Sequence, residues 1–327
     1  MAVILDVNGL SLSFTVAGKQ LSVLDNVTFS LNKNEILALV GESGCGKSVT
    51  CMSIGRLNDE SLAQYDSGEI NFYTENGKIN ILDLSKKELR KLRKKKISYI
   101  FQNPITSLNP VFKIGDQIAE SVSDEIEDVN SYIVKLLEMV GISSPETRIE
   151  CYPHELSGGM QQRVMIAMAL ASSPEILIAD EPTTALDVTI QAQILEIFYD
   201  IKINLNTSII LVTHDLGIVS DIADRVAVMY AGQIVEIGRK EEVILNPFHP
   251  YTKALLESVP KLGNGTKRLK SIPGFVPEPE MYTDCCRFLE RCWKYVLLNE
   301  KDKCVCRTRN VDILSKNNNH SARCHFA

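Results

Sequence analysis

The sequence predicts an α/β fold, a mostly parallel sheet with helices on both of its faces. Short apolar runs typical of buried strands alternate along the chain with segments of helical periodicity. The strand-like runs are 35–40, 97–102, 175–180 and 208–213, and the helical segments are 47–57, 157–172, 188–205 and 216–225. Strands that alternate with helices pair in parallel and are covered on both faces, which is the basis of this prediction.

The rest of the chain divides around this core. Residues 4–14 and 23–32 alternate apolar and polar residues as half-buried strands do, and further strands are predicted at 68–73, 79–84 and in a hairpin at 226–238 that turns at Ala231-Gly232. We predict a core at 1–104 and 165–245, an inserted helical subdomain at 105–164 and a small cysteine-containing C-terminal region at 246–327. Proline and glycine recur after Asn246, and this change in composition indicates the last boundary.

The overall composition excludes several classes of protein. The 327 residues include 35 Lys plus Arg and 41 Asp plus Glu, so the net charge is −6, and such a chain is a poor general binder of nucleic acid. No apolar run approaches the roughly 18 residues of a spanning helix, and the first residues do not resemble a signal peptide. We therefore expect a cytosolic chain whose membrane role, if it has one, comes from a partner.

A phosphate-binding loop is predicted between the strand at 35–40 and the helix that follows it. Gly41-Glu42-Ser43-Gly44-Cys45-Gly46-Lys47-Ser48 fits the pattern G-x-x-x-x-G-K-[ST]. Its glycines let backbone N–H groups turn toward phosphates, Lys47 is expected to reach the β- and γ-phosphates of ATP, and Ser48 to ligate Mg²⁺. Val49 completes the nucleotide-binding segment. The alternative is a glycine-rich turn that binds nothing.

Two carboxylates follow the apolar strand 176–179. Asp180 at the strand tip is expected to hold Mg²⁺, and Glu181 to polarise the attacking water as general base. The alternative is that the two carboxylates are ordinary surface charges. This alternative is less favoured because a phosphate loop precedes them in the chain, in the order found in P-loop enzymes.

A helix start at 156–163 narrows the prediction. Leu156-Ser157-Gly158-Gly159-Met160-Gln161-Gln162-Arg163 resembles the signature sequence of ABC ATPases. Small residues at a helix start expose N–H groups to a second anion; the alternative is a capped helix start alone. The resemblance implies a P-loop NTPase fold with an N-terminal antiparallel β-subdomain. It also implies two subunits packed head to tail, in which Ser157, Gly158, Gly159 and Gln161 face the partner's ATP.

Further motifs match the ABC ATPase family in the same order. Gln102 resembles the Q-loop glutamine, which contacts Mg²⁺ or the attacking water and senses the membrane partner. Thr184-Ala185-Leu186-Asp187 resembles the D-loop, with Asp187 at the dimer interface. His214 resembles the switch histidine that contacts the γ-phosphate, and Phe14 the aromatic residue that stacks on adenine. A structural histidine and a core aromatic are the respective alternatives.

Three segments resemble the oligopeptide/dipeptide/nickel importer branch of this family: 101–110, 246–256 and 272–274. The resemblance implies an ATP-hydrolysing subunit for oligopeptide or dipeptide uptake, with nickel or a metal chelate as the alternative cargo. Its expected partners are a second ATPase subunit (a paralogue or a second copy), two transmembrane permease subunits and an extracytoplasmic substrate-binding protein. The expected location is peripheral, on the cytoplasmic face of the inner membrane. Asn34 stands where the family usually has glycine.

Two other classes remain as alternatives. A non-transport ABC protein acting on DNA or the ribosome usually carries two nucleotide folds or a long insertion, whereas the spacing from Ser48 to Leu156 is ordinary. The second alternative is a nucleotide-gated regulatory or scaffold protein. The presence of Glu181 and His214, the residues expected to support hydrolysis, argues against it.

Six of the nine cysteines lie in the last 43 residues. Four thiolates suit an iron–sulfur cluster or zinc, and the family resemblance implies a [4Fe-4S] cluster on Cys286, Cys292, Cys304 and Cys324. Cys285 and Cys306 are rival ligands, and Glu290 stands where the family tends to have proline. Free thiols are the third interpretation.

A strongly basic helix is predicted at 86–96, opened by a capping box at Ser85-x-x-Glu88. Nucleic acid and anionic lipid are conceivable ligands. We favour a solvated helix face with Leu89 and Leu92 turned inward.

Overall fold

The computed structural model describes residues 2–75, 77–102, 107–184, 186–258, 271–308, 311–317 and 320–327. The chain forms two compact units. The first unit comprises residues 1–2, 32–36 and 83–212, and the second comprises 3–31, 37–82 and 213–327. Among the described residues, no helix combines the length and the apolar character that a membrane span requires.

The first unit has three strands that pair in parallel. β6 (Ile97–Ile100) pairs with β7 (Ile176–Asp180), and β7 pairs with β8 (Ser208–Thr213). Every residue of β7 and β8 is buried, which explains why their sequences are continuous apolar runs rather than alternating ones. The predicted parallel strands are thus confirmed. β6 ends two residues earlier than predicted, and Pro104, the residue expected to stop it, lies outside the described part of the chain.

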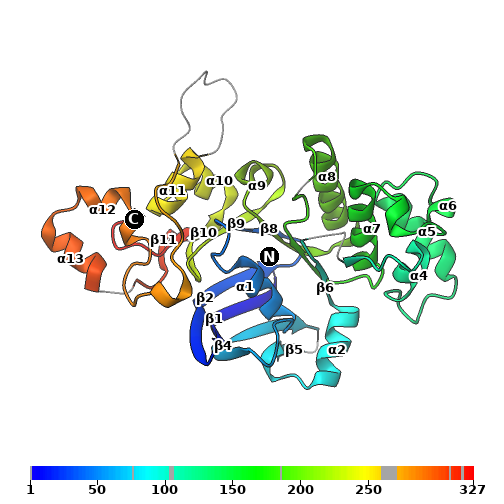
Figure 1. Ribbon diagram of the computed structural model, residues 1–327, viewed down its shortest axis with the longest axis horizontal. Helices are drawn as coiled ribbons and strands as arrows, with labels where there is room; N and C mark the ends of the chain where they lie inside the picture. The colour runs from blue at the N-terminus through cyan, green and yellow to red at the C-terminus, as the bar shows by residue number, and fades with distance from the viewer. Residues whose placement is uncertain are drawn as a thin grey trace. The chain divides into compact units, whose positions relative to one another are not determined.

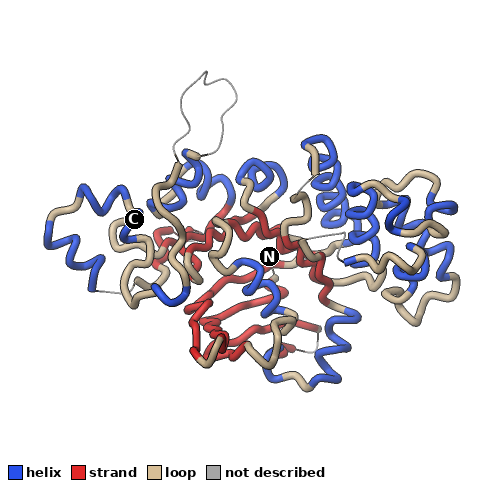
Figure 2. The backbone as a smooth tube through the Cα atoms, in the orientation of Figure 1, coloured by secondary structure: helices blue, strands red, loops and turns tan. Residues whose placement is uncertain are grey.

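Helices make up most of the rest of the first unit. They are α2 (Lys86–Lys95), α4 (Ile114–Ala119), α5 (Val129–Met139), α6 (Pro145–Arg148), α7 (Gly158–Leu170) and α8 (Val188–Leu205), with a 3₁₀ turn η2 (Pro153–Glu155). Helices α4, α5 and α7 contact one another, and α6 contacts α5. Figure 2 shows this block as helices joined by loops, in agreement with the helical periodicity of the sequence.

The basic helix α2 has the predicted capping box. The Ser85 hydroxyl accepts a hydrogen bond from the N–H of Glu88, whose carboxylate accepts one from the N–H of Ser85. Leu89 and Leu92 are buried, as expected. Lysines on the exposed face pair with carboxylates of the same unit: Lys94 with Asp124, Lys95 with Glu125 and Lys96 with Glu175. These contacts favour the solvated-face interpretation of the helix.

The second unit begins with an antiparallel sheet of order β2-β1-β4-β5 (Figure 1). Its strands are β1 (Val3–Val16), β2 (Lys19–Asn32), β4 (Ala63–Thr74) and β5 (Gly77–Asn80). The strand predicted at 79–84 is wrong beyond Asn80, where a 3₁₀ turn η1 (Ile81–Asp83) follows. The strand ends at Asn80 because the side-chain oxygen of this residue accepts hydrogen bonds from the N–H groups of Ile70 and Leu82. These bonds turn the chain away from the sheet.

A second group of strands in this unit contains the start of the phosphate loop. β3 (Ile36–Val40) pairs in parallel with β9 (Arg225–Tyr230), which forms the predicted hairpin with β10 (Gln233–Arg239). Helix α1 (Lys47–Ile54) follows β3, and α9 (Leu216–Ile222) precedes β9. The predicted helix 216–225 is therefore three residues too long. Arg225 instead pairs with Leu37 as the first residue of β9, and its guanidinium donates to the carbonyl of Ser30.

The C-terminal part of the second unit contains elements that the sequence did not predict. They are α10 (Lys240–Leu245), α11 (Pro250–Glu257), the 3₁₀ turns η3 (Pro279–Met281) and η4 (Leu289–Arg291), α12 (Trp293–Leu297), α13 (Glu300–Thr308), β11 (Leu314–Asn317) and β12 (His320–Ala322). β12 pairs with β10 and β11 pairs with β12, both antiparallel. A cluster of Tyr230, Tyr251 and Phe288, with ring centroids 4.7 to 5.4 Å apart, packs this part on the hairpin β9–β10.

Candidate functional site

The predicted phosphate loop connects β3 to α1 in the second unit. A Cβ atom on Gly41 would lie 2.2 Å from the carbonyl oxygen of Met229, so only glycine fits there. Gly46 has a φ of +104°, in the left-handed region that favours glycine. The ammonium of Lys47 donates to the carbonyl oxygens of Gly41 and Glu42 at 2.8 and 3.0 Å. The loop therefore encloses the positive charge that we expect to meet the phosphates.

The other residues of the loop differ in exposure. Ser43 and Gly44 are exposed, Ser48 and Val49 lie half-buried in the first turn of α1, and Cys45 is buried. Burial raises the pKa of the Cys45 thiol, although the charge of Lys47 opposes this effect. Cys45 thus contributes its backbone to the loop while its side chain packs inside the unit.

The two predicted carboxylates lie at the end of β7 in the first unit. Asp180 is only 5% exposed, and the Tyr99 hydroxyl donates to its Oδ2 at 2.9 Å. Glu181 follows with a φ of +46°, a backbone conformation that costs a non-glycine residue about 1 to 2 kcal/mol. Its N–H donates to the carbonyl of Val212 at 3.0 Å. Strained backbone of this kind concentrates at functional sites, where the surrounding structure holds it in place.

Gln102 contacts the predicted general base directly. Its side-chain Nε2 donates to Oε2 of Glu181 at 2.8 Å, and the Thr184 hydroxyl donates to the same oxygen at 2.9 Å. These two bonds orient the carboxylate of Glu181. The structure therefore brings Gln102 into contact with the acidic pair Asp180-Glu181, through Glu181, and so joins two motifs that the sequence selected separately. Thr184 belongs to the predicted D-loop, and Ala185 lies outside the described residues.

The predicted signature lies at the start of α7. Ser157 is the N-cap, and its hydroxyl accepts from the N–H of Met160 at 3.3 Å. A Cβ atom on Gly158 would meet nothing within 4 Å, whereas one on Gly159 would lie 3.0 Å from the Ile190 side chain. The helix start is thus open to solvent at Gly158 and closely packed at Gly159. The Gln161 side-chain amide donates to the carbonyls of Pro153 and Leu156, so it braces the preceding turn.

Three further predicted residues have different surroundings. Asp187 is the N-cap of α8, and its carboxylate accepts from the N–H of Ile190 at 3.0 Å. His214 is exposed between β8 and α9. Phe14 is half-buried in β1, opposite Ala63 of β4. Contact of His214 and Phe14 with a nucleotide stays a prediction.

Comparisons with known proteins agree with these motifs. Residues 24–184 match the ABC transporter family model, and residues 235–296 match that of the oligopeptide/dipeptide transporter C-terminal region. The oligopeptide transport ATP-binding protein OppD of Bacillus subtilis (strain 168) is 51% identical over 280 residues, 84% of this chain and 77% of that protein. AppD of the same organism, also an oligopeptide transport ATP-binding protein, is 44% identical over 328 residues, 99% of this chain and 97% of that one.

Solved structures show the same fold. The dimeric ATP-binding cassette MJ0796 in a post-hydrolysis state bound to ADP and Pi superposes with a TM-score of 0.63 at 26% identity, covering 72% of this chain and 99% of that one. The chain belongs to the ATP-binding proteins of ABC transporters. Proteins of this family hydrolyse ATP to power transport, so the chain is an ATPase that uses ATP and Mg²⁺. The fold that the sequence resemblance implied is confirmed.

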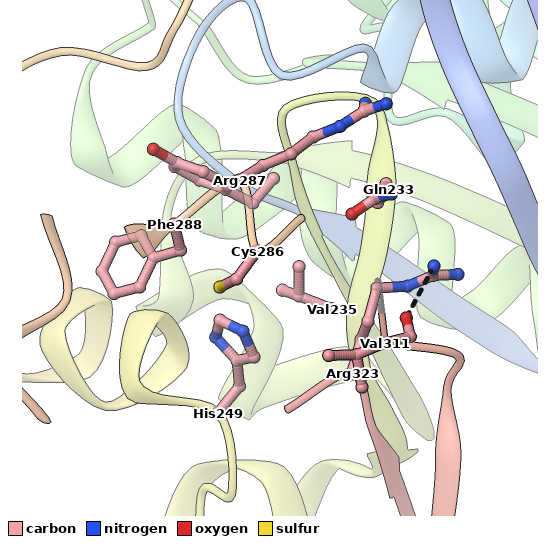
Figure 3. Close-up of a pocket in the computed structure, with 9 residues that line it drawn as sticks. Gln233, Val235, His249, Cys286, Arg287, Phe288, Val311 and Arg323 are labelled. Atoms are coloured by element: carbon pink, nitrogen blue, oxygen red, sulfur yellow. Dashed lines mark hydrogen bonds between the residues drawn. The ribbon is translucent and has the colours of Figure 1, made fainter. Parts of the chain in front are cut away.

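Four cysteines of this ABC transporter ATP-binding protein line one cavity of about 20 Å³, which we call the thiol cavity. They are Cys286, Cys292, Cys306 and Cys324. Burial raises the pKa of Cys286 to about 12, and it raises the pKa of Cys292 and Cys306 as well. Figure 3 shows a neighbouring pocket that shares Cys286, His249 and Phe288 with the thiol cavity, and there the Cys286 sulfur lies on the side of the His249 ring. Among the described residues, no group of three or more His, Cys, Asp or Glu side chains is arranged to hold a metal ion.

The thiol cavity differs from the predicted ligand set in one residue. Cys304 is exposed on α13, and Cys306 lines the cavity instead. Two residues along an α-helix turn the side chain by about 200°, so the two cysteines point in nearly opposite directions. The choice between these rivals depends on the rotation of α13, which the sequence spacing did not reveal.

Sequence reasoning missed two residues that contact the phosphate loop of this ATPase. Tyr251 in α11 accepts a hydrogen bond from the N–H of Glu42, and Arg291 in η4 forms an ion pair with the Glu42 carboxylate. Both lie more than 200 residues from the loop in sequence. The signals that could have drawn attention to them are the importer-branch segment around Tyr251 and the Arg291-Cys292 dipeptide.

Proposed function

We propose that this ABC transporter ATP-binding protein powers the uptake of oligopeptides or dipeptides through partner membrane subunits. The observation that carries the proposal is the match of residues 235–296 to the oligopeptide/dipeptide transporter C-terminal region. Relatives named for oligopeptide or dipeptide transport, at 44–51% identity, support it further. The same observations favour peptides over nickel or a metal chelate.

In the proposed mechanism, each motif of the sequence has one task. Lys47 neutralises the β- and γ-phosphates inside the loop Gly41–Ser48. Glu181, oriented by Gln102 and Thr184, accepts the proton of the attacking water. His214 contacts the γ-phosphate. The hydrogen bonds of Glu181 support this assignment, because they hold the carboxylate before any nucleotide has to arrange it.

The hydroxyl of Ser48, the amide oxygen of Gln102 and the carboxylate of Asp180 are oxygen donors, the ligand type that Mg²⁺ prefers. Asp180 is almost fully buried at a strand end, as expected of a carboxylate that meets a cation there. These residues would hold the ion. When bound, Mg²⁺ neutralises charge that develops on the phosphates.

The active assembly is proposed to contain two ATPase subunits, this chain with a paralogue or a second copy. Ser157, Gly158, Gly159, Gln161 and Asp187 would face the partner's nucleotide, and Phe14 would stack on adenine. The open helix start at Gly158 supports this role, since a bound phosphate needs access to the N–H groups there. ATP would close the dimer, and loss of the γ-phosphate would release it.

Two permease subunits and an extracytoplasmic substrate-binding protein complete the proposed importer, with no role for nucleic acid. The ATPase would lie peripherally on the cytoplasmic face of the inner membrane. For the chain itself we propose a nucleotide-binding core at 1–104 and 165–245, a helical subdomain at 105–164 and a C-terminal region at 246–327.

The cargo can be tested by reconstitution. We expect ATP turnover of this chain, assembled in lipid with its permease partners and its binding protein, to rise several-fold when a peptide is added. Nickel chelates serve as the comparison ligand. Stimulation by the chelate alone would move the assignment to metal uptake, and stimulation by neither would remove the importer proposal while leaving the ATPase intact.

A [4Fe-4S] cluster on the C-terminal cysteines is a second proposal. It is supported by four cysteines that line one cavity, the donor set that such a cluster uses. The cavity of about 20 Å³ has room for little more than a water molecule, so these segments would have to move apart around a bound cluster. A single zinc ion fits less well, since its four ligands would have to meet about 2.3 Å from one atom, and the described side chains are not gathered in that way. A bound cluster would link η4, α13 and the chain end through Cys292, Cys306 and Cys324.

The cysteine pair on α13 gives this proposal a matched test. In anaerobically purified protein, we expect Cys306→Ser to lower the iron content at least about threefold and Cys304→Ser to leave it unchanged, because only Cys306 lines the cavity. Iron and visible absorption are measured per chain. A loss of iron in Cys304→Ser alone would restore the ligand set expected from the sequence. Wild-type protein without iron would end the cluster proposal.

A further inference from the structure

Glu42, the second residue of the phosphate loop, is held from outside the loop at two points. Its N–H donates a hydrogen bond to the Tyr251 hydroxyl at 2.9 Å. Its carboxylate accepts hydrogen bonds from both terminal nitrogens of Arg291, at 2.8 and 2.9 Å. Two parallel bonds between a guanidinium and a carboxylate fix direction as well as distance. Glu42 is therefore fixed through both backbone and side chain.

Arg291 is itself rigidly placed. Its side chain is 5% exposed, whereas that of Glu42 is 31% exposed. Its Nε donates to the carbonyl of Pro273 at 2.8 Å, and one terminal nitrogen also approaches the Tyr230 hydroxyl at 3.4 Å. A guanidinium with this many fixed partners can transmit the position of the C-terminal part of the unit to the group that it binds.

The effect of Glu42 on the loop passes through Lys47. The carbonyl oxygen of Glu42 accepts a hydrogen bond from the Lys47 ammonium at 3.0 Å, and that of Gly41 accepts another at 2.8 Å. Any rotation of the Glu42 peptide would thus displace the ammonium that meets the phosphates. Arg291, Glu42 and Lys47 form one continuous series of polar contacts from the C-terminal part of the chain to the nucleotide site.

We propose that Arg291 is a positioning residue of the ATPase: by holding Glu42, it sets the conformation of the phosphate loop and so the affinity for ATP. The C-terminal region, which contains Arg291 and the thiol cavity, is in this view a part of the nucleotide site. The proposal rests on nucleotide binding at Gly41–Ser48. A purely structural role for the ion pair would affect stability and leave ATP affinity unchanged.

Titration calorimetry of the full-length chain with Mg²⁺ and a non-hydrolysable ATP analogue tests the proposal. We expect Arg291→Gln to weaken binding about tenfold, by analogy with the smallest losses seen when a group that orients a metal-binding residue is removed. Arg291→Lys keeps the charge without the two-pronged geometry and should give an intermediate affinity. In steady-state assays KM for ATP should rise while kcat at saturating ATP stays near the wild-type value.

A double-mutant cycle tests whether Arg291 acts through Glu42. Glu42→Gln alone should weaken binding as much as Arg291→Gln, and the double variant should be no weaker than either, since both remove the same contact. Glu42 is half-buried, so its variant is available even if Arg291→Gln does not fold.

Arg323→Gln is the matched control. Arg323 is equally buried, and it donates to the carbonyls of Ile234, Val311 and Asn26, none of which belongs to the phosphate loop. It should lower the melting temperature without changing nucleotide affinity. Wild-type affinity in folded Arg291→Gln and Glu42→Gln proteins would overturn the proposal. Lys47→Ala tests the nucleotide site itself. If ATP binds at Gly41–Ser48, this variant should lose binding whether or not Arg291 has a positioning role. If Lys47→Ala still binds ATP, the proposed site is wrong, and not only the role of Arg291.

Discussion

Replacing Glu181 with glutamine is expected to lower ATP turnover about a thousandfold while ATP binding is retained. Glutamine keeps the size of the side chain and an oxygen that can accept from Gln102 and Thr184. It cannot accept a proton from water, and loss of a general base typically costs 10²- to 10⁴-fold in rate. Phosphate release under single-turnover conditions and calorimetric binding of ATP measure the two quantities separately.

Glu175→Gln is the control for this variant. Glu175 lies just before β7, at the opposite end of the strand from Glu181, and pairs with Lys96 at the surface. Loss of such an exposed pair costs at most about 1 kcal/mol of stability, so turnover should remain at the wild-type level. Near-normal turnover in Glu181→Gln would remove Glu181 as the base and leave His214 as the candidate proton acceptor.

The sequence predicted the catalytic part of the fold well, because that part is built from local patterns. Gly41–Ser48 follows a buried strand and opens a helix in the structure as it does in the sequence. Asp180 ends a strand whose five residues are all buried. In each case the motif and the structure that displays it lie within about ten residues of chain, so the pattern of apolar residues, glycines and carboxylates was sufficient.

The sequence could not predict contacts between segments far apart in the chain. The contact between Gln102 and Glu181 joins positions 79 residues apart, and that between Glu42 and Arg291 joins positions 249 apart. The sequence also did not predict where an element ends when a side-chain hydrogen bond determines that end. Asn80 ended a strand early, and the rotation of α13 exchanged Cys304 for Cys306 at the thiol cavity. Each of these depends on three-dimensional packing rather than on local propensity.

Glu236 provides the second large effect, this time on stability. It is a fully buried carboxylate in β10, and it accepts hydrogen bonds from the N–H groups of Phe248 and His249 at 2.7 and 2.9 Å. Its Oε1 also lies 2.7 Å from Nε2 of His320 in β12. One carboxylate thus joins the start of α11 and the final strand to the hairpin β9–β10. Sequence reasoning missed this role, since a glutamate within an apolar strand is expected to face solvent.

Glu236→Ala is expected to reduce the free energy of unfolding by about 3 to 5 kcal/mol, because it leaves the buried N–H of His249, the half-buried N–H of Phe248 and a buried imidazole without their acceptor. Trp293, the one tryptophan of the chain, lies in the C-terminal part of the same unit, so its fluorescence during urea unfolding reports on the affected region. Glu241→Ala, on the exposed first turn of α10, is the control and should cost less than about 1 kcal/mol. A difference below about 1 kcal/mol between the two variants would mean that packing of Tyr230, Tyr251 and Phe288, and not the buried carboxylate, holds the C-terminal elements on the hairpin β9–β10. In that event the route from Arg291 to the phosphate loop would depend on the aromatic cluster, and Phe288→Ala would become the variant to compare.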